Sequence, residues 1–173
     1  MGPGLGHLFK TPRALSEIEI SEIVGRFATS AALAREAGFG GVQIHAAHGY
    51  LINQFLLPHH NCREDDWGGD ASRRRRFLLE VYRAMRTAVG DDYPIGIKLN
   101  SADFLRGGFS EEESMDVVDQ IAAEGIDLIE ISGGTYESPA MVGHRVKEST
   151  RKREAYFLVE SNELIAHGFA VNE

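Results

Sequence analysis

The stretch Gly40–Leu56, GGVQIHAAHGYLINQFL, turns from a short apolar segment into a loop that carries three polar rings. Its first six residues predict a β-strand. His45 and His48 stand where that strand gives way to the loop, and Tyr50 follows across a glycine. The stretch therefore predicts a strand whose C-terminal end carries a candidate binding site.

A helix precedes this strand. The sequence SEIEISEIVGRFATSAALAREAGF offers Ser16 as the N-cap residue and Glu19 as its partner in a capping box. Gly38 ends the pattern, so we expect a helix between Ser16 and Gly38. Apolar residues recur along it at the spacing of one helical face: Ile20, Ile23, Val24, Phe27, Ala31 and Ala34.

Two further pairs of helix and strand follow. The sequence ASRRRRFLLEVYRAMRTAVG predicts a helix that ends at Gly90, and YPIGIKLN predicts the strand after it. A third helix begins at Ser110, where Glu113 predicts another capping box. It gives way at Gly125 to the strand IDLIEIS. The order is helix, strand, helix, strand, helix, strand.

This alternation predicts an α/β fold, because neighbouring parallel strands must be joined by a crossover, which is usually a helix. The chain has 173 residues, of which 43% are apolar. That length suits one domain with a hydrophobic core and is short for two. We therefore expect residues 1–173 to form a single domain.

The loops that leave the strands are long, at residues 47–70, 101–110 and 133–152. Long loops without secondary structure in a compact domain are usually functional. All three follow the C-terminal ends of strands, the edge at which barrels and open α/β sheets place their chemistry. The residues at equivalent positions on that edge are His45, Lys98 and Ser132.

The composition disfavours several classes of partner. A formal net charge of -8 opposes binding to nucleic acid and to anionic membranes. The one cysteine, Cys62, excludes an intrachain disulfide and a metal site with several cysteines. The sequence has no apolar run long enough for a membrane span and no signal or transit peptide pattern. We expect a cytoplasmic protein that binds neither nucleic acid nor a membrane.

The residues His45, His48 and Tyr50 can together activate an α,β-unsaturated carbonyl compound. Two imidazole N–H groups can hold a carbonyl oxygen and stabilise the negative charge that develops on it, while a phenol delivers a proton. A simpler interpretation is that one histidine is structural and the other is solvated. Lys98 adds a positive charge beside the same site, unless its ammonium group reaches out to solvent at the strand end.

Gly133 and Gly134 directly follow the last strand, where they allow the backbone to approach a flat ring or a phosphate. No GxGxxG motif follows any strand, so the dinucleotide fingerprint is missing. Metal binding by the histidines is a rival interpretation, but their spacing fits no recognised ligand set and we expect no metal site. The histidines in question are His45, His48, His59 and His60.

The charged segment NCREDDWGGDASRRRRF has a structural interpretation. Arg63 and the acidic residues can hold a long loop by ion pairs and hydrogen bonds, and Trp67 can anchor it by packing. We expect this role rather than catalysis.

The sequence AGFGGVQIHAAHGYLINQFLLPHHNCREDDWGGDASRRRRFLLE resembles the signature of the old yellow enzyme family of FMN-dependent NAD(P)H:flavin oxidoreductases. The segments IGIKLNSADFLRGGFSEEES and LIEISGGTYESPAM continue the resemblance in the same order. It implies a (β/α)8 barrel with FMN at its C-terminal mouth. It also implies that hydride from NAD(P)H passes through the flavin to an activated alkene such as an enone.

The resemblance assigns a role to each candidate residue. His45 and His48 become the pair that holds the substrate's carbonyl oxygen, and Tyr50 becomes the proton donor. Lys98 matches the basic residue beside the pyrimidine edge of the flavin, where positive charge stabilises the anionic reduced form. The residues that would border the cofactor are Gly133 and Gly134.

The resemblance covers residues 10–158, and residues 159–173 form a divergent tail. A complete barrel needs about 250 residues, so we expect a partial TIM barrel of about three consecutive parallel βα units. Its open sheet edges could pair copies into a homo-oligomer. We also expect weak or no binding of free FMN. The alternative to an FMN-dependent enzyme is a catalytically incompetent fragment that acts, if at all, as an interaction or structural module.

Overall fold

The computed structural model describes residues 12–104 and 107–135, which hold four helices and three strands. The divergent tail expected at residues 159–173 and most of the third long loop lie outside the described residues. The elements in chain order are α1 (Glu17–Glu36), β1 (Val42–Ala46), α2 (Leu51–Leu56), α3 (Ala71–Val89), β2 (Ile95–Asn100), α4 (Glu111–Ala123) and β3 (Leu128–Ser132).

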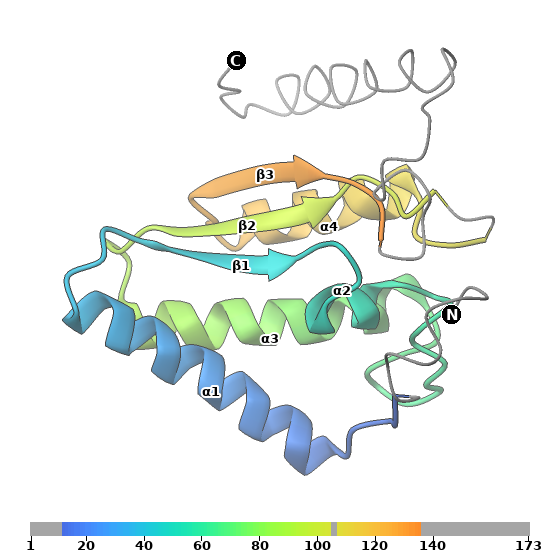
Figure 1. Cartoon of the computed structure of the whole chain (residues 1–173), viewed down its shortest axis with the longest axis horizontal. Helices are drawn as coiled ribbons and strands as arrows, with labels where there is room; N and C mark the ends of the chain where they lie inside the picture. The colour runs from blue at the N-terminus through green and yellow to red at the C-terminus, as the bar shows by residue number, and fades with distance from the viewer. Residues whose placement is uncertain (1–11, 105–106, 136–173) are drawn as a thin grey trace.

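The three strands form one parallel sheet in the order β1-β2-β3, and helices lie between successive strands in the chain (Figure 1). The register pairs His45 with Lys98 and Lys98 with Glu130. The expected α/β fold of three consecutive βα units is therefore confirmed, and the strands lie where the sequence predicts them. Because all three strands run the same way, their C-terminal ends meet at one edge of the sheet.

The helices cover one face of the sheet, with α1 and α3 lying side by side beneath it in Figure 1. Side chains alternate between the two faces of a strand. Those of Ile44, Ile97 and Leu99 point toward the helices and are fully buried. The opposite face carries mostly polar side chains, and we call it the polar face: Gln43, His45, Lys98, Asn100, Glu130 and Ser132.

The ends of the long helices follow the sequence signals with one exception. Ser16 and Glu19 form the complete capping box at the start of α1. At the start of α4, Ser110 accepts a hydrogen bond from the Glu113 backbone N–H, but the Glu113 side chain is bound by Arg74 instead of returning to the cap. The second capping box is thus wrong in its reciprocal half, because an arginine from α3 competes for the carboxylate.

The segment 47–70 is not the structureless loop that the sequence suggested. It contains α2, a helix of six residues that begins after Tyr50. Ile52 and Leu56 of this helix are buried, and Phe55 stacks on Phe77 of α3 with ring centroids 4.2 Å apart. The helix buries apolar area under the rim of the sheet and so fixes the loop that carries the histidines.

The structural role expected for the charged segment is confirmed. Arg63 pairs with Asp65 at 2.5 Å and donates to the Leu15 carbonyl at 2.6 Å, tying the loop to the segment before α1. Trp67 packs against the core, and the guanidinium of Arg76 lies 4.4 Å from the centre of its ring. These contacts hold the connection between α2 and α3 in place.

Candidate functional site

Three rings meet at the C-terminal end of β1. The ring centroids of His45 and His48 are 5.2 Å apart with their planes at 73°, and the centroids of His45 and Tyr50 are 4.8 Å apart. His45 and Tyr50 are exposed, whereas His48 is half-buried. The strand supplies the first ring and the turn into α2 supplies the other two. The sequence spacing therefore does bring these three candidate residues together.

The turn that carries His48 is held by buried amides. His48 has φ of 62°, in the left-handed region that few residues other than glycine adopt readily. Its backbone N–H donates to Asn100 Oδ1 at 3.3 Å, and the next N–H, of Gly49, donates to Asn53 Oδ1 at 2.7 Å. Both asparagines are fully buried. They turn the chain at the end of β1 so that the second ring faces the first.

The His48 ring is also tied to β3. Its Nε2 lies 2.6 Å from the hydroxyl oxygen of Ser132, a hydrogen bond whose direction depends on the tautomer of the ring. A parallel bridge between His48 and Thr135 joins the two segments further along. Ser132, expected at an equivalent strand end, thus lies within reach of the histidine pair.

Lys98 lies on the polar face beside His45, as expected, but its ammonium group does not point freely to solvent. Its Nζ lies 2.6 Å from Glu130 Oε1. The other oxygen of Glu130 accepts a hydrogen bond from Gln43 Nε2 at 2.9 Å. A row of polar contacts therefore crosses all three strands just below the rim.

Burial and nearby charge set the protonation of the rings. Although His45 is exposed, partial desolvation of its ring and then the Lys98 ammonium group lower its pKa below the ordinary value of 6.5. Burial, then His45, then Lys98 lower the pKa of His48. Glu130 opposes both shifts, and its own pKa is lowered by the hydrogen bonds from Lys98 and Gln43. Both imidazoles are therefore neutral at pH 7, and each carries one N–H donor.

The glycines after β3 lie at the same edge of the sheet. Gly134 is buried, with φ of 80°, and its N–H donates to the Ala102 carbonyl at 3.1 Å. Its carbonyl accepts a hydrogen bond from Asn100 Nδ2 at 2.7 Å. Gly133 is half-buried. Since both backbone groups of Gly134 are used, its contribution to a ligand would be space rather than hydrogen bonds.

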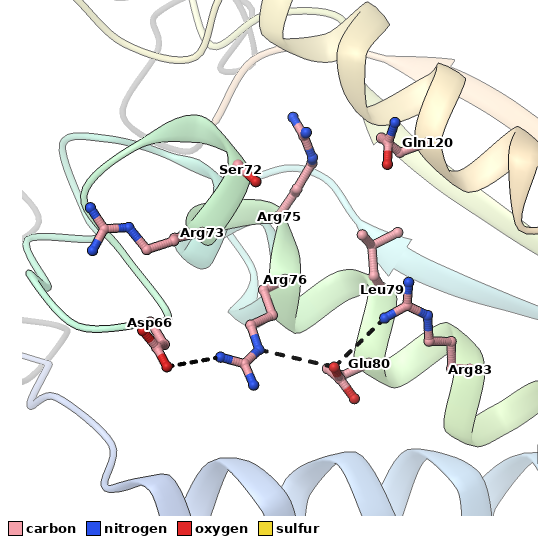
Figure 2. A pocket seen from close by; sticks show the side chains of 9 residues that line it. All are labelled: Asp66, Ser72, Arg73, Arg75, Arg76, Leu79, Glu80, Arg83 and Gln120. Atoms are coloured by element: carbon pink, nitrogen blue, oxygen red, sulfur yellow. Dashed lines mark ion pairs between the residues drawn. The ribbon is translucent and has the colours of Figure 1, made fainter.

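A second region of polar side chains lies elsewhere. A hollow of about 430 Å³ between α3 and α4 is lined by arginines, and Figure 2 shows the ion pairs that run from Asp66 through Arg76 and Glu80 to Arg83. The acidic partners compensate these positive charges. None of the candidate residues at the rim lines this hollow.

Two general features can be stated for the part of the chain that the structure describes. No three histidine, cysteine, aspartate or glutamate residues in it are grouped so as to hold a metal ion. None of its helices combines the length and the apolar character that crossing a membrane requires.

Sequence reasoning missed three members of the site, namely Gln43, Asn100 and Glu130. Each lies two residues from a predicted site residue on the same strand or pairs with one across the sheet. The signal was the alternation within VQIHA, IGIKLN and LIEIS, which places every second residue on the same face. Assigning every second strand residue to one face of the sheet would have added all three residues to the predicted site.

The chain is similar to several flavin-dependent oxidoreductases. It is 44% identical over 137 residues to an NADH-dependent flavin oxidoreductase of Neonectria sp. (strain DH2). That alignment covers 78% of this chain and 17% of the relative. It is 42% identical to an NADH oxidase of Thermoanaerobacter brockii, over 73% of this chain and 20% of the relative. It is 39% identical to an NADPH dehydrogenase of Clostridium acetobutylicum, over 81% of this chain and 42% of the relative.

A solved structure of 2-naphthoyl-CoA reductase in complex with 2-naphthoyl-CoA is similar in fold, with a TM-score of 0.72 and 39% identity. The match covers 73% of this chain and 19% of that one. The chain thus spans between 17% and 42% of the length of the proteins named here. What it matches is therefore a section of each relative.

The sequence model of one protein family matches residues 6–168, which is nearly the whole chain. That match includes all three strands and all of the rings at the rim. The chain belongs to the NADH:flavin oxidoreductase / NADH oxidase family.

Proposed function

We propose that this chain carries the carbonyl-binding part of an FMN-dependent oxidoreductase that reduces the activated C=C bond of α,β-unsaturated carbonyl compounds. FMN and a nicotinamide hydride donor are the cofactors of its family. The observation that supports the proposal best is the cluster of His45, His48 and Tyr50, with ring centroids no more than 5.2 Å apart along the cluster. Two neutral imidazoles and a phenol at one rim suit a substrate that gains both a hydride and a proton.

The two histidines would bind the carbonyl oxygen. As hydride reaches the β-carbon, negative charge moves onto that oxygen, and N–H donors held in advance stabilise it. Neutral imidazoles suit this task because each keeps one N–H donor at pH 7, and the lowered pKa of His45 and of His48 favours that state. For His48 the role requires that Ser132 donates to Nε2, which leaves the Nδ1–H for the substrate. The buried amides of Asn53 and Asn100 would keep the donors in place before the substrate arrives.

Tyr50 would deliver the proton to the α-carbon of the substrate. A phenolic O–H can act as a general acid when it lies within reach of the atom that it protonates. The ring lies 4.8 Å from that of His45, so a substrate whose oxygen is held by the histidine pair would extend past the phenol. The hydride and the proton then add to neighbouring carbons, and the alkene becomes a saturated carbonyl compound.

The residues on the polar face fit a flavin in their chemistry. When bound, FMN supplies the hydride that it has received from NAD(P)H. Lys98 offers a cation, which would stabilise the pyrimidine edge of a ring that gains negative charge on reduction. Glu130 compensates part of that charge through its ion pair. Gly133 and Gly134 would leave room for the ring at the end of β3.

In a second candidate function, the chain carries the site residues but catalyses no reaction by itself. The polar face is covered by no described element, and β1 and β3 each pair with one strand in the described residues. These features favour a section that performs its chemistry only with further parts of a barrel around it. By itself the chain would then act, if at all, as an interaction or structural module.

Purification of the chain with FMN present distinguishes an active enzyme from an inactive section of a barrel. An active flavoprotein would keep a yellow flavin spectrum through gel filtration and would oxidise NADH or NADPH when a cyclic enone is added. We expect weak FMN binding by the chain alone, because few exposed contacts must offset the loss of rigid-body freedom on association. Micromolar, stoichiometric quenching of FMN fluorescence would contradict that expectation and favour the enzyme.

A further inference from the structure

Glu130 connects side chains from all three strands. Its Oε1 lies 2.6 Å from Lys98 Nζ of β2, and its Oε2 accepts from Gln43 Nε2 of β1 at 2.9 Å. The register places Lys98 directly between His45 and Glu130. The carboxylate therefore uses both of its oxygens to hold groups on the polar face.

Without a partner, a lysine side chain in this position would not keep one conformation. Its four-carbon stem is flexible, and fixing it costs rotamer entropy. The Lys98 side chain is 27% exposed, so solvent competes for the ammonium group. A single ion pair that solvent reaches contributes too little to serve as a source of stability. What the contact with Glu130 does provide is a preferred direction for the ammonium group.

We infer that Glu130 is a positioning residue, which with Gln43 holds the Lys98 ammonium group over the polar face beside His45. This inference rests on the proposed function for its consequence, since a fixed cation matters most if a flavin ring and a substrate lie above it. The position of the ammonium group itself depends only on the contacts of Glu130 with Lys98 and Gln43.

The consequence concerns the field that the histidines experience. Lys98 lowers the pKa of His45 and of His48, whereas Glu130 raises both. With the pair in place the two effects partly cancel, and both charges remain at fixed distances from the rings. If the carboxylate were lost, the ammonium group would reach into solvent and its effect on the rings would weaken with distance.

The test is a mutant cycle read through the pKa of His45, measured by NMR titration of the full chain without any flavin. The variants are Lys98→Met, Glu130→Gln and the double variant. Lys98→Met removes the cation and should raise the pKa of His45. If Glu130 holds the ammonium group in place, the same substitution made in the Glu130→Gln background should raise that pKa by about half as much or less, because the cation has already moved away.

An equal or larger rise in the Glu130→Gln background would overturn the inference, since Lys98 would then stay beside His45 unaided. Glu112→Gln serves as the matched control, because this glutamate is exposed on α4 away from the polar face, and it should leave the cycle unchanged. Should Glu130→Gln fail to fold by circular dichroism, Glu130→Asp replaces it. Its shorter stem cannot reach both partners, so the effect of Lys98→Met should still shrink.

A second measurement separates this inference from the proposed function. In a form of the protein that holds FMN, Lys98→Met should lower the midpoint potential of the flavin, because the cation that stabilises the anionic reduced ring is lost. A reduced Lys98 effect on His45 with an unchanged potential would support the positioning by Glu130 and contradict the role of Lys98 toward the flavin. An undiminished Lys98 effect would reject the positioning whatever the potential does.

Discussion

His48 depends on residues far from it in the sequence. Its positive φ is held by the side chain of Asn100, 52 residues away, and its ring is bound by Ser132, 84 residues away. The pattern of two histidines and a tyrosine predicts which residues meet at the rim. It does not predict the backbone conformation that makes them meet, because that conformation is stabilised by amides from other strands and helices.

The histidine pair predicts a pH dependence of stability. The folded pKa of His45 and of His48 lies below the unfolded value of about 6.5, so the folded chain binds fewer protons and stability rises with pH across that interval. Their contribution is fully present above about pH 6.5 and is lost as the pH falls toward the folded values. Replacing both with glutamine should therefore flatten the dependence of the unfolding free energy on pH between about pH 5 and about pH 7.

Urea unfolding at a series of pH values measures this effect. Unfolding free energies above about pH 7.5, where neither histidine titrates, provide the internal control and should change little with pH in both proteins. A double variant with the same slope as the parent in the acidic interval would show that the environment of the rings does not depress their protonation.

At the level of the element, the start of α1 provides a direct comparison. Ser16 caps the helix through the reciprocal contact with Glu19, whereas Ser21 lies exposed in the helix interior. Ser16→Ala should destabilise the chain by about 1 kcal/mol, because a backbone N–H loses its partner. Ser21→Ala should be neutral or slightly stabilising, since alanine has the higher helix propensity. Thermal unfolding of both variants measures the difference, and equal effects would argue against the cap.

The arginine run at the start of α3 contains neighbours with different roles. Arg74 is buried, donates to the Leu56 carbonyl at 3.0 Å and to the Gly69 carbonyl at 2.6 Å, and pairs with Glu113. Arg75 reaches an exposed carboxylate, that of Asp116, at 3.9 Å. Arg74 therefore joins α3 to α2 and α4, whereas half-buried Arg75 makes one long contact with an exposed carboxylate.

Substituting each arginine with methionine tests this assignment. Arg74→Met should cost about 3 kcal/mol of unfolding free energy, because it leaves a partly buried carboxylate without its partner. Arg75→Met should cost less than about 1 kcal/mol, because its ion pair is long and the carboxylate left behind is exposed to water. Chemical denaturation gives both values. If the two substitutions cost the same, the buried contacts of Arg74 contribute no more than a surface ion pair.

The same elements show what local sequence can predict. The strands, both ends of α1 and the C-terminal end of α3 follow from apolar spacing, a capping serine and terminal glycines, all of which act over a few residues. The helix α2 was missed because six residues give too short a period, and tertiary packing of Phe55 and Leu56 stabilises it. The partner of Glu113 was missed for a related reason, since Arg74 belongs to another helix.

For the whole molecule, the described residues show one covered and one polar sheet face. The helices bury the apolar side chains on one side. In the described part of the chain no helix packs on the polar face, and the outer edges of β1 and β3 pair with no strand. Pairing of copies through these strand edges stays a prediction, as do the single domain over residues 1–173 and the roles assigned to Gly133 and Gly134. The family assignment accounts for a sheet face that the helices leave uncovered, because in a (β/α)8 barrel alternate strand residues point to the interior.

We propose that the histidine pair acts on the oxygen of the substrate. In any form of the protein that holds FMN, rapid mixing measures two steps separately: reduction of the flavin by NADH or NADPH, and its reoxidation by an enone. For the variant with both His45 and His48 replaced by alanine, we predict that reoxidation by the enone slows by at least about a hundredfold, while flavin reduction changes far less. An equal loss in both steps would contradict the account, because the histidines would then serve the flavin or the fold.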